Sequence, residues 1–295
     1  MFKSGFISII GRPNVGKSTL LNTLMGTKIA ITSPKPQTTR DRITGIINDE
    51  NYQMIFVDTP GIHKGKHLLG KTINKIATNS IGDVDVILFV VDRKLNDTNK
   101  EVLHQLQKTT LPVILVINKI DELLSKTHID EIITSFLGSY NFKAIIPISA
   151  KDKTHISYLK EAILESLPQG PKYYPSDYTT DQSETTLIKE LIREKILYQA
   201  EQEVPHSVAV VIESLTFNSE YNTYDISAII ICERPTQKQI LIGKAGSKLK
   251  EIGTQARKEI NKILKTKIHL SLWIKVKKDW RNDPNELKRY GYTDE

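Results

Sequence analysis

A glycine-rich stretch near the N-terminus constrains the fold of this chain more than any other feature. Residues 11–18 fit the pattern G-x-x-x-x-G-K-[ST] at every fixed position. The pattern binds phosphate when a strand leads into the loop and a helix leaves it, because the start of that helix aims free N–H groups at an anion. An apolar run at 6–10 and a helix-like segment at 19–25 satisfy both conditions. The sequence therefore predicts a nucleotide phosphate site at this loop.

The segments after the loop indicate the fold around it. Strand-like runs at 42–47 and 52–57 are joined by a turn, and apolar runs at 84–92, 112–117 and 144–148 alternate with helix-like segments. Such runs are typical of a parallel sheet that helices cover on both faces. We therefore expect an α/β doubly wound sheet with one antiparallel hairpin. Its ligands should bind at the carboxyl ends of the strands.

The length of 295 residues favours two domains. We expect the first domain at 1–170 and a proline-containing linker at 171–183. A smaller α+β domain should occupy 184–278, and the polar segment 279–295 should be a loosely attached tail. The single Cys232 fits a reducing compartment, and no apolar stretch approaches the ~20 residues that span a bilayer, so we expect a cytoplasmic protein.

Polar residues after a later strand indicate which base is bound. The segment 118–121 reads Asn-Lys-Ile-Asp and follows an apolar run. The carboxylate of Asp121 can accept hydrogen bonds from both N1–H and the 2-amino group of guanine, a donor pattern that adenine lacks. Lys119 would cover the base plane with its stem, and the backbone of 149–151 would meet the guanine carbonyl. The sequence therefore predicts GTP rather than ATP.

Together these elements resemble the translation-factor-like small GTPases over residues 11–151. The resemblance implies that Thr38 or Thr39 closes over the γ-phosphate and Mg²⁺; spacing leaves both open, and we favour Thr39. The expected Mg²⁺ residues are Ser18, Thr39 and Asp58, and the expected catalytic residues are Lys17, Asn14 and Thr39. The expected switch residues are Gln37, Thr38, Thr39, Arg40 and Asp41. The expected GTP contacts are Gly11, Arg12, Pro13, Asn14, Val15, Gly16, Lys17, Ser18, Thr19, Asp58, Thr59, Pro60, Gly61, Ile62, Asn118, Lys119, Ile120, Asp121, Ser149, Ala150 and Lys151.

One position departs from the Ras-like pattern. Ile62 stands where Ras-like enzymes carry the glutamine that orients the attacking water. Isoleucine has no polar atom for this task, so we expect slow intrinsic hydrolysis. Asn14, together with the later threonine loop, is similar to GTPases in which bound K⁺ stands where an arginine finger would insert. The alternative is that Asn14 only caps the phosphate loop.

Positive charge is concentrated in the C-terminal part of the chain. Residues 243–278 hold eleven basic side chains against two acidic ones, an excess larger than the formal net charge of +7 for the whole chain. The remainder is therefore slightly acidic. A polyanionic partner is expected to bind this part of the chain.

The predicted order of elements in this basic part is helix, strand, strand, helix, loop, helix, strand, which is similar to a type II KH domain. In KH domains a G-x-x-G loop clamps the backbone of about four unpaired nucleotides. Glycines let the backbone approach phosphate and lysines add charge. The expected RNA-binding residues are Ile242, Gly243, Lys244, Ala245, Gly246 and Lys248.

A GTPase domain, a linker and a KH-like domain in one chain resemble the Era family of bacterial GTPases. The resemblance covers nearly the whole chain. It implies binding to small-subunit ribosomal RNA and the ribosomal subunit, a role in small-subunit assembly, and peripheral contact with the inner face of the cell membrane. For the mechanism we expect a switch between GTP and GDP, in which GTP with Mg²⁺ orders residues 33–41 and the segment after Gly61 and thereby exposes or aligns the loop at 243–246 for RNA. We expect a monomer. Two rivals stay open: a membrane-surface switch whose basic domain binds anionic lipid, and a signalling GTPase whose KH-like part is a scaffold.

Overall fold

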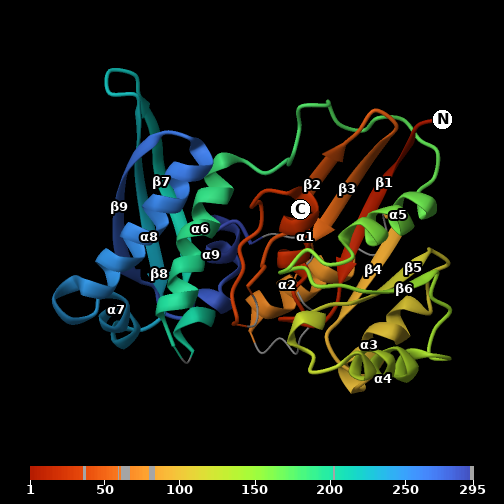
Figure 1. Cartoon of the computed structure of the whole chain (residues 1–295). Coiled ribbons are helices and arrows are strands. Elements are labelled where there is room, and N and C mark those ends of the chain that lie inside the picture. The colour runs from red at the N-terminus through yellow and green to blue at the C-terminus, as the bar shows by residue number, and fades with distance from the viewer. Residues whose placement is uncertain (36–37, 59, 61–66, 80–83, 202, 293–295) are drawn as a thin grey trace. The chain divides into compact units, whose positions relative to one another are not determined.

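The chain forms two compact units in the computed structural model (Figure 1). The structure describes residues 1–35, 38–58, 60, 67–79, 84–201 and 203–292, with the backbone alone at residues 74 and 76–79. Unit 1 comprises Met1–Thr32, Thr39–Lys64 and Ile73–Asp181. Unit 2 comprises Ser33–Thr38, Gly65–Thr72 and Gln182–Glu295.

Unit 1 is built on a six-stranded sheet in the order β2-β3-β1-β4-β5-β6. The strands are β1 (Lys3–Ile10), β2 (Ile43–Asn48), β3 (Tyr52–Asp58), β4 (Val86–Val91), β5 (Val113–Ile117) and β6 (Ala144–Pro147). β2 runs antiparallel to β3, and every other pair of neighbours is parallel. The carboxyl ends of β1, β3, β4, β5 and β6 therefore lie at one edge of the sheet. This is the α/β doubly wound sheet with one antiparallel hairpin that the sequence predicts.

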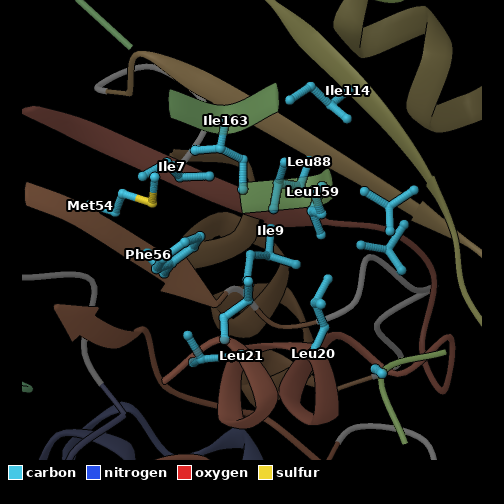
Figure 2. Packing of buried hydrophobic residues seen from close by; sticks show 14 of the residues in the cluster. Ile7, Ile9, Leu20, Leu21, Met54, Phe56, Leu88, Ile114, Leu159 and Ile163 are labelled. Atoms are coloured by element: carbon cyan, nitrogen blue, oxygen red, sulfur yellow. The ribbon is translucent and has the colours of Figure 1, made fainter. Parts of the chain in front are cut away.

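Helices bury both faces of this sheet. One face packs against α1 (Lys17–Met25) and α5 (Ile156–Ser166), and the other against α3 (Asp97–Leu106) and α4 (Lys126–Phe136). The alternation of side chains along a strand explains the division, since Ile9 joins the first cluster and Ile10 the second. Figure 2 shows part of the first cluster, in which Leu20 and Leu21 of α1 lie on one side of Ile9 and Leu159 and Ile163 of α5 lie on the other. A further helix, α2, spans Leu68–Asn79.

The predicted linker is bound along the free edge of this sheet. Residues 171–181 form no helix or strand, but the N–H of Ile46 donates to the carbonyl of Thr179 at 2.9 Å. The side-chain oxygen of Gln53 accepts from the N–H groups of Tyr173 and Tyr174 at 2.8 and 3.0 Å. These bonds explain why residues as far as 181 belong to unit 1.

Unit 2 has the element order that the sequence predicts for a type II KH domain. Its main elements are α6 (Glu184–Gln199), β7 (Ala209–Asn218), β8 (Thr223–Cys232), α7 (Pro235–Ile242), α8 (Ser247–Leu264) and β9 (Lys267–Val276). β7 pairs antiparallel with β8, and β8 pairs parallel with β9. α8 buries Ile252, Ala256 and Ile260, whose spacing of four residues places them on one face of the helix. No helix in the part of the chain that the structure describes has the length and apolar character needed to cross a bilayer.

The expectation of a loosely attached tail at 279–295 is wrong for residues 279–292. Trp280 lies in a short 3₁₀ helix (Trp280–Asn282), is fully buried, and donates from Nε1 to the carbonyl of Ser207 at 3.0 Å. Helix α9 (Pro284–Arg289) follows, and the rings of Tyr290 and Tyr292 lie 5.5 and 6.1 Å from the ring of Trp280. The prediction is based on the polar composition of the segment, but a few large side chains are sufficient to anchor it.

We expect Trp280→Ala to lower the free energy of unfolding by about 3–5 kcal/mol, because a buried indole and its hydrogen bond are lost. The matched control is Trp273→Ala, since Trp273 is 64% exposed and its loss should cost under about 1 kcal/mol. Urea unfolding followed by circular dichroism measures both changes. Equal losses in the two variants would contradict the packing of residues 279–292.

Candidate functional site

The phosphate loop joins β1 to α1 and requires glycine at both ends. Gly11 has φ 149° and Gly16 has φ 94°, values that side chains disfavour. A Cβ on Gly11 would lie 2.4 Å from the carbonyl oxygen of Val90, and one on Gly16 would lie 2.3 Å from Nδ2 of Asn118. Val15 is fully buried and anchors the loop in the core. The loop is thus held tightly against the strands beneath it.

Lys17 points back into this loop. Its Nζ donates to the carbonyls of Gly11 and Arg12 at 3.0 and 3.2 Å, and its side chain is buried. Burial lowers the pKa of Lys17, and the negative charge of Asp58 raises it in part. The ammonium group is therefore held inside the phosphate loop by its carbonyls.

Three oxygen-bearing side chains from different segments meet at the start of α1. The hydroxyl of Ser18 donates to Oδ2 of Asp58 at 2.8 Å and lies 2.8 Å from Oγ1 of Thr39. Thr39 donates to the same Asp58 oxygen at 3.3 Å. Thr38 instead donates to the carbonyl of Lys35 at 2.7 Å. The structure thus brings Thr39, and not Thr38, to Ser18 and Asp58, and hard oxygen donors of this kind suit Mg²⁺.

Asn118 connects its own loop at 118–121 to the phosphate loop and to the loop at 149–151. Its Nδ2 donates to the carbonyl of Val15 at 2.8 Å, and its Oδ1 accepts from the N–H of Ala150 at 3.0 Å. Its own N–H donates to the carbonyl of Val91 at 2.7 Å. Asp121 accepts from the hydroxyl of Ser149 at 2.6 Å. The side chain of Asn118 therefore joins the segments 118–121 and 149–151 to the phosphate loop.

Sequence reasoning missed Asp92, which directly follows β4. Its Oδ1 accepts from Nη2 of Arg12 at 2.6 Å, and its Oδ2 lies 3.5 Å from Nζ of Lys119. Burial alone would raise the pKa of Asp92, but the hydrogen bond from Arg12 and the charges of Arg12, Arg93 and Lys119 hold it below its usual value. The available signal was a carboxylate at the end of a buried strand between two motif-bearing strands.

Some predicted residues lie outside the described part of the chain. These are Gln37 in the switch loop and Thr59, Gly61 and Ile62 after β3. Pro60 and Arg40 are described and buried, and Asp41 is half-buried. The expectation of slow hydrolysis, which depends on Ile62, is therefore not tested by the geometry.

The G-x-x-G loop of unit 2 connects α7 to α8 through a 3₁₀ turn (Lys244–Gly246). Gly243 has φ 73° and ψ 178°, and a Cβ there would lie 2.7 Å from Cβ of Lys248. Gly246 has φ 77°, but a Cβ there would meet no heavy atom within 4 Å. Gly243 is therefore required by packing, whereas Gly246 leaves the loop open to an approaching ligand.

A groove with a volume of about 480 Å³ begins at this loop. It combines leucine side chains with Lys250 and Arg257. The leucines can contact the apolar faces of bases, and the two cations can bind phosphates. Of the residues that line this groove, the sequence predicts an RNA contact only for Gly246. The lining residues are Gly246, Leu249, Lys250, Gly253, Thr254, Arg257, Leu270 and Leu272.

Comparisons with known families agree with both units. A model described as a 50S ribosome-binding GTPase matches residues 6–119, and a model described as a KH domain matches residues 203–281. The fold and the two sites thus define a P-loop GTPase joined to a KH domain.

Full-length relatives identify the family. GTPase Era of Clostridioides difficile (strain 630) is 48% identical over 296 residues, covering 100% of this chain and 100% of that protein. GTPase Era of Clostridium kluyveri (strain NBRC 12016) is 48% identical over 294 residues, covering 99% and 100%. The chain therefore belongs to the Era family of GTPases.

Two solved structures are similar to the whole chain. One is Era in complex with MgGDPNP and nucleotides 1506–1542 of 16S ribosomal RNA, with a TM-score of 0.96 and 39% identity. The other is a variant of Aquifex aeolicus Era bound to GDP.AlF4-, also with a TM-score of 0.96 and 39% identity. Each similarity covers 99% of this chain and 100% of the solved chain.

Proposed function

We propose that unit 1 binds GTP with Mg²⁺ and hydrolyses it at the carboxyl edge of the sheet. The observation that carries this proposal is the meeting of Ser18, Thr39 and Asp58 beside the buried Lys17. Ser18 and Thr39 would hold the metal and Asp58 would orient them. The relative solved with MgGDPNP supports the same choice of metal. When bound, Mg²⁺ neutralises charge on the phosphate oxygens.

The residues of unit 1 then have distinct tasks. The N–H groups at the start of α1 bind phosphate, and Lys17 leaves the loop carbonyls to reach the β and γ oxygens. Asp121 selects guanine, while Asn118 holds its loop against the phosphate loop. We also propose that Asn14, whose φ is 65°, is a ligand of bound K⁺. Comparing the rate of GTP hydrolysis in KCl with the rate in NaCl tests this role.

We expect Thr39→Ala to weaken binding of a non-hydrolysable GTP analogue about tenfold in the presence of Mg²⁺. The reason is that the variant lacks the hydroxyl that lies beside Ser18 and Asp58 and that we assign to the metal. The affinity for GDP should change little, since GDP has no γ-phosphate. The control is Thr38→Ala, whose hydroxyl donates within its own loop to Lys35. Titration with fluorescent nucleotides measures both variants. A larger effect of Thr38→Ala than of Thr39→Ala would reverse the assignment.

We further propose that unit 2 binds single-stranded ribosomal RNA and that the protein assists assembly of the small ribosomal subunit. The groove at the G-x-x-G loop, with Lys250 and Arg257, carries this proposal. The relative solved with nucleotides 1506–1542 of 16S ribosomal RNA supports the choice of RNA. In this account Gly243 shapes the loop, Gly246 admits the RNA backbone, and Lys244 and Lys248 add charge.

Gly246→Asp tests the RNA site, because a side chain there fits without collision and adds a negative charge beside the phosphates. We expect RNA affinity to fall at least about tenfold at fixed salt. Gly246→Asn is the matched control, since Asn has nearly the same shape, tolerates the left-handed backbone and carries no charge.

Fluorescence anisotropy with an RNA oligonucleotide measures both variants, and vesicles with anionic lipid provide the second ligand. Unchanged RNA binding by Gly246→Asp would contradict the clamp and favour the scaffold function. Tight vesicle binding without RNA binding would favour the membrane-surface function.

The segment before Thr39 provides a route by which the nucleotide state can affect unit 2. Ser33–Thr38 belongs to unit 2, where Lys35 donates to the carbonyl of Ala200 at the end of α6. Arg193 of α6 donates to the carbonyl of Thr38 and is held by Glu190 through Nε at 2.9 Å. A ligand that engages Thr39 therefore acts on a chain segment whose preceding residues are bound to α6. We propose that GTP controls RNA binding through this segment.

A further inference from the structure

Asp92 lies between the two loops to which we assigned the phosphates and the base of the nucleotide in the proposed function. It follows β4, which pairs with β1 on one side and with β5 on the other. β1 leads into the phosphate loop, where Arg12 lies, and β5 leads into the base loop, where Lys119 lies. One carboxylate therefore connects side chains from both loops.

The environment of this carboxylate makes its contacts strong. The side chain of Asp92 is only 6% exposed, and the side chains of Arg12 and Lys119 are 19% and 30% exposed. Arg93 adds a third cation, with its Nε 3.2 Å from Oδ1 of Asp92. The lowered pKa keeps Asp92 ionised at neutral pH. Hydrogen bonds between ionised groups in a partly dry site are stronger than neutral ones.

Asn118 already joins the same loops through backbone groups, so Asp92 has a different task. Asn118 fixes the backbone of the phosphate loop at Val15 and the backbone of the loop at 149–151 at Ala150. Asp92 instead holds the side chains of Arg12 and Lys119. Without the carboxylate, these cations would repel each other at the base of the site.

We propose that Asp92 is a positioning residue for nucleotide binding, which holds Arg12 beside the phosphates and the stem of Lys119 in place for the base. The inference rests on the proposed GTP site in unit 1. Asp92 acts through its partners and touches no reacting atom. Its loss should therefore weaken GDP and GTP binding equally, while the preference for guanine, which Asp121 supplies, is retained.

The test is Asp92→Asn, which keeps the shape of the side chain and removes its charge. We expect GDP to dissociate about tenfold faster, corresponding to about 1.4 kcal/mol, and KM for GTP to rise by the same factor with kcat within about twofold. Asp92→Glu should restore most of the affinity because it keeps the carboxylate. The matched control is Asp97→Asn, which removes an exposed carboxylate that lies 3.2 Å from Lys100 and should leave dissociation unchanged.

Introducing Asp92→Asn into an Arg12→Gln variant shows whether Asp92 acts through Arg12. In Arg12→Gln protein, adding Asp92→Asn should accelerate GDP release less than about threefold, because the nearer of its partners in the two loops, Arg12, is already lost and only Lys119 is left there. Stopped-flow release of fluorescent GDP measures all variants, and thermal unfolding confirms that they are folded. Release from Asp92→Asn within twofold of the unmodified protein, or an undiminished effect in the Arg12→Gln background, would overturn the inference. Failure of the unmodified protein to bind GDP would instead overturn the proposed function.

Discussion

The side chain of Asn118 makes the hydrogen bonds on which the nucleotide site depends. In a parallel sheet the carboxyl ends of the strands meet at one edge, but the loops that leave them are free to separate. Asn118 prevents this by binding the carbonyl of Val15 and the N–H of Ala150. Both groups are buried beside it, so their loss of a partner would be costly. Loops that are far apart in the sequence are thereby held as one surface.

The same edge also explains why charged groups are buried in unit 1. Lys17, Asp58 and Asp92 are all largely buried, which is costly for isolated charges. Each has partners in place: carbonyls surround Lys17, hydroxyls donate to Asp58, and cations surround Asp92. The buried strands exclude water from the base of the site, and the loops contribute the groups that compensate the cost of burying charge. A charged ligand such as a nucleotide phosphate can then exchange with these internal partners.

Most of the fold could be predicted because its signals are local. Runs of β-branched residues and the G-x-x-x-x-G-K-[ST] pattern identified the sheet, and the order of elements after residue 184 identified the KH-like unit. Thr38 and Thr39 could not be separated, because only their positions relative to Ser18 and Asp58 distinguish them. The contacts of Asp92 depend on which strands become neighbours, and the groove at Leu270 and Leu272 depends on how α8 packs beside β9; spacing encodes neither. The tail was mispredicted because Trp280 gains its partners only in the folded unit.

We propose above that the nucleotide in unit 1 controls RNA binding by unit 2. The measurement is the affinity of the full chain for an oligonucleotide that corresponds to nucleotides 1506–1542 of 16S ribosomal RNA, at fixed salt. It should be made once with GDP and once with a non-hydrolysable GTP analogue, both with Mg²⁺. The account predicts binding about tenfold tighter with the analogue. Equal affinities in the two nucleotide states would contradict it.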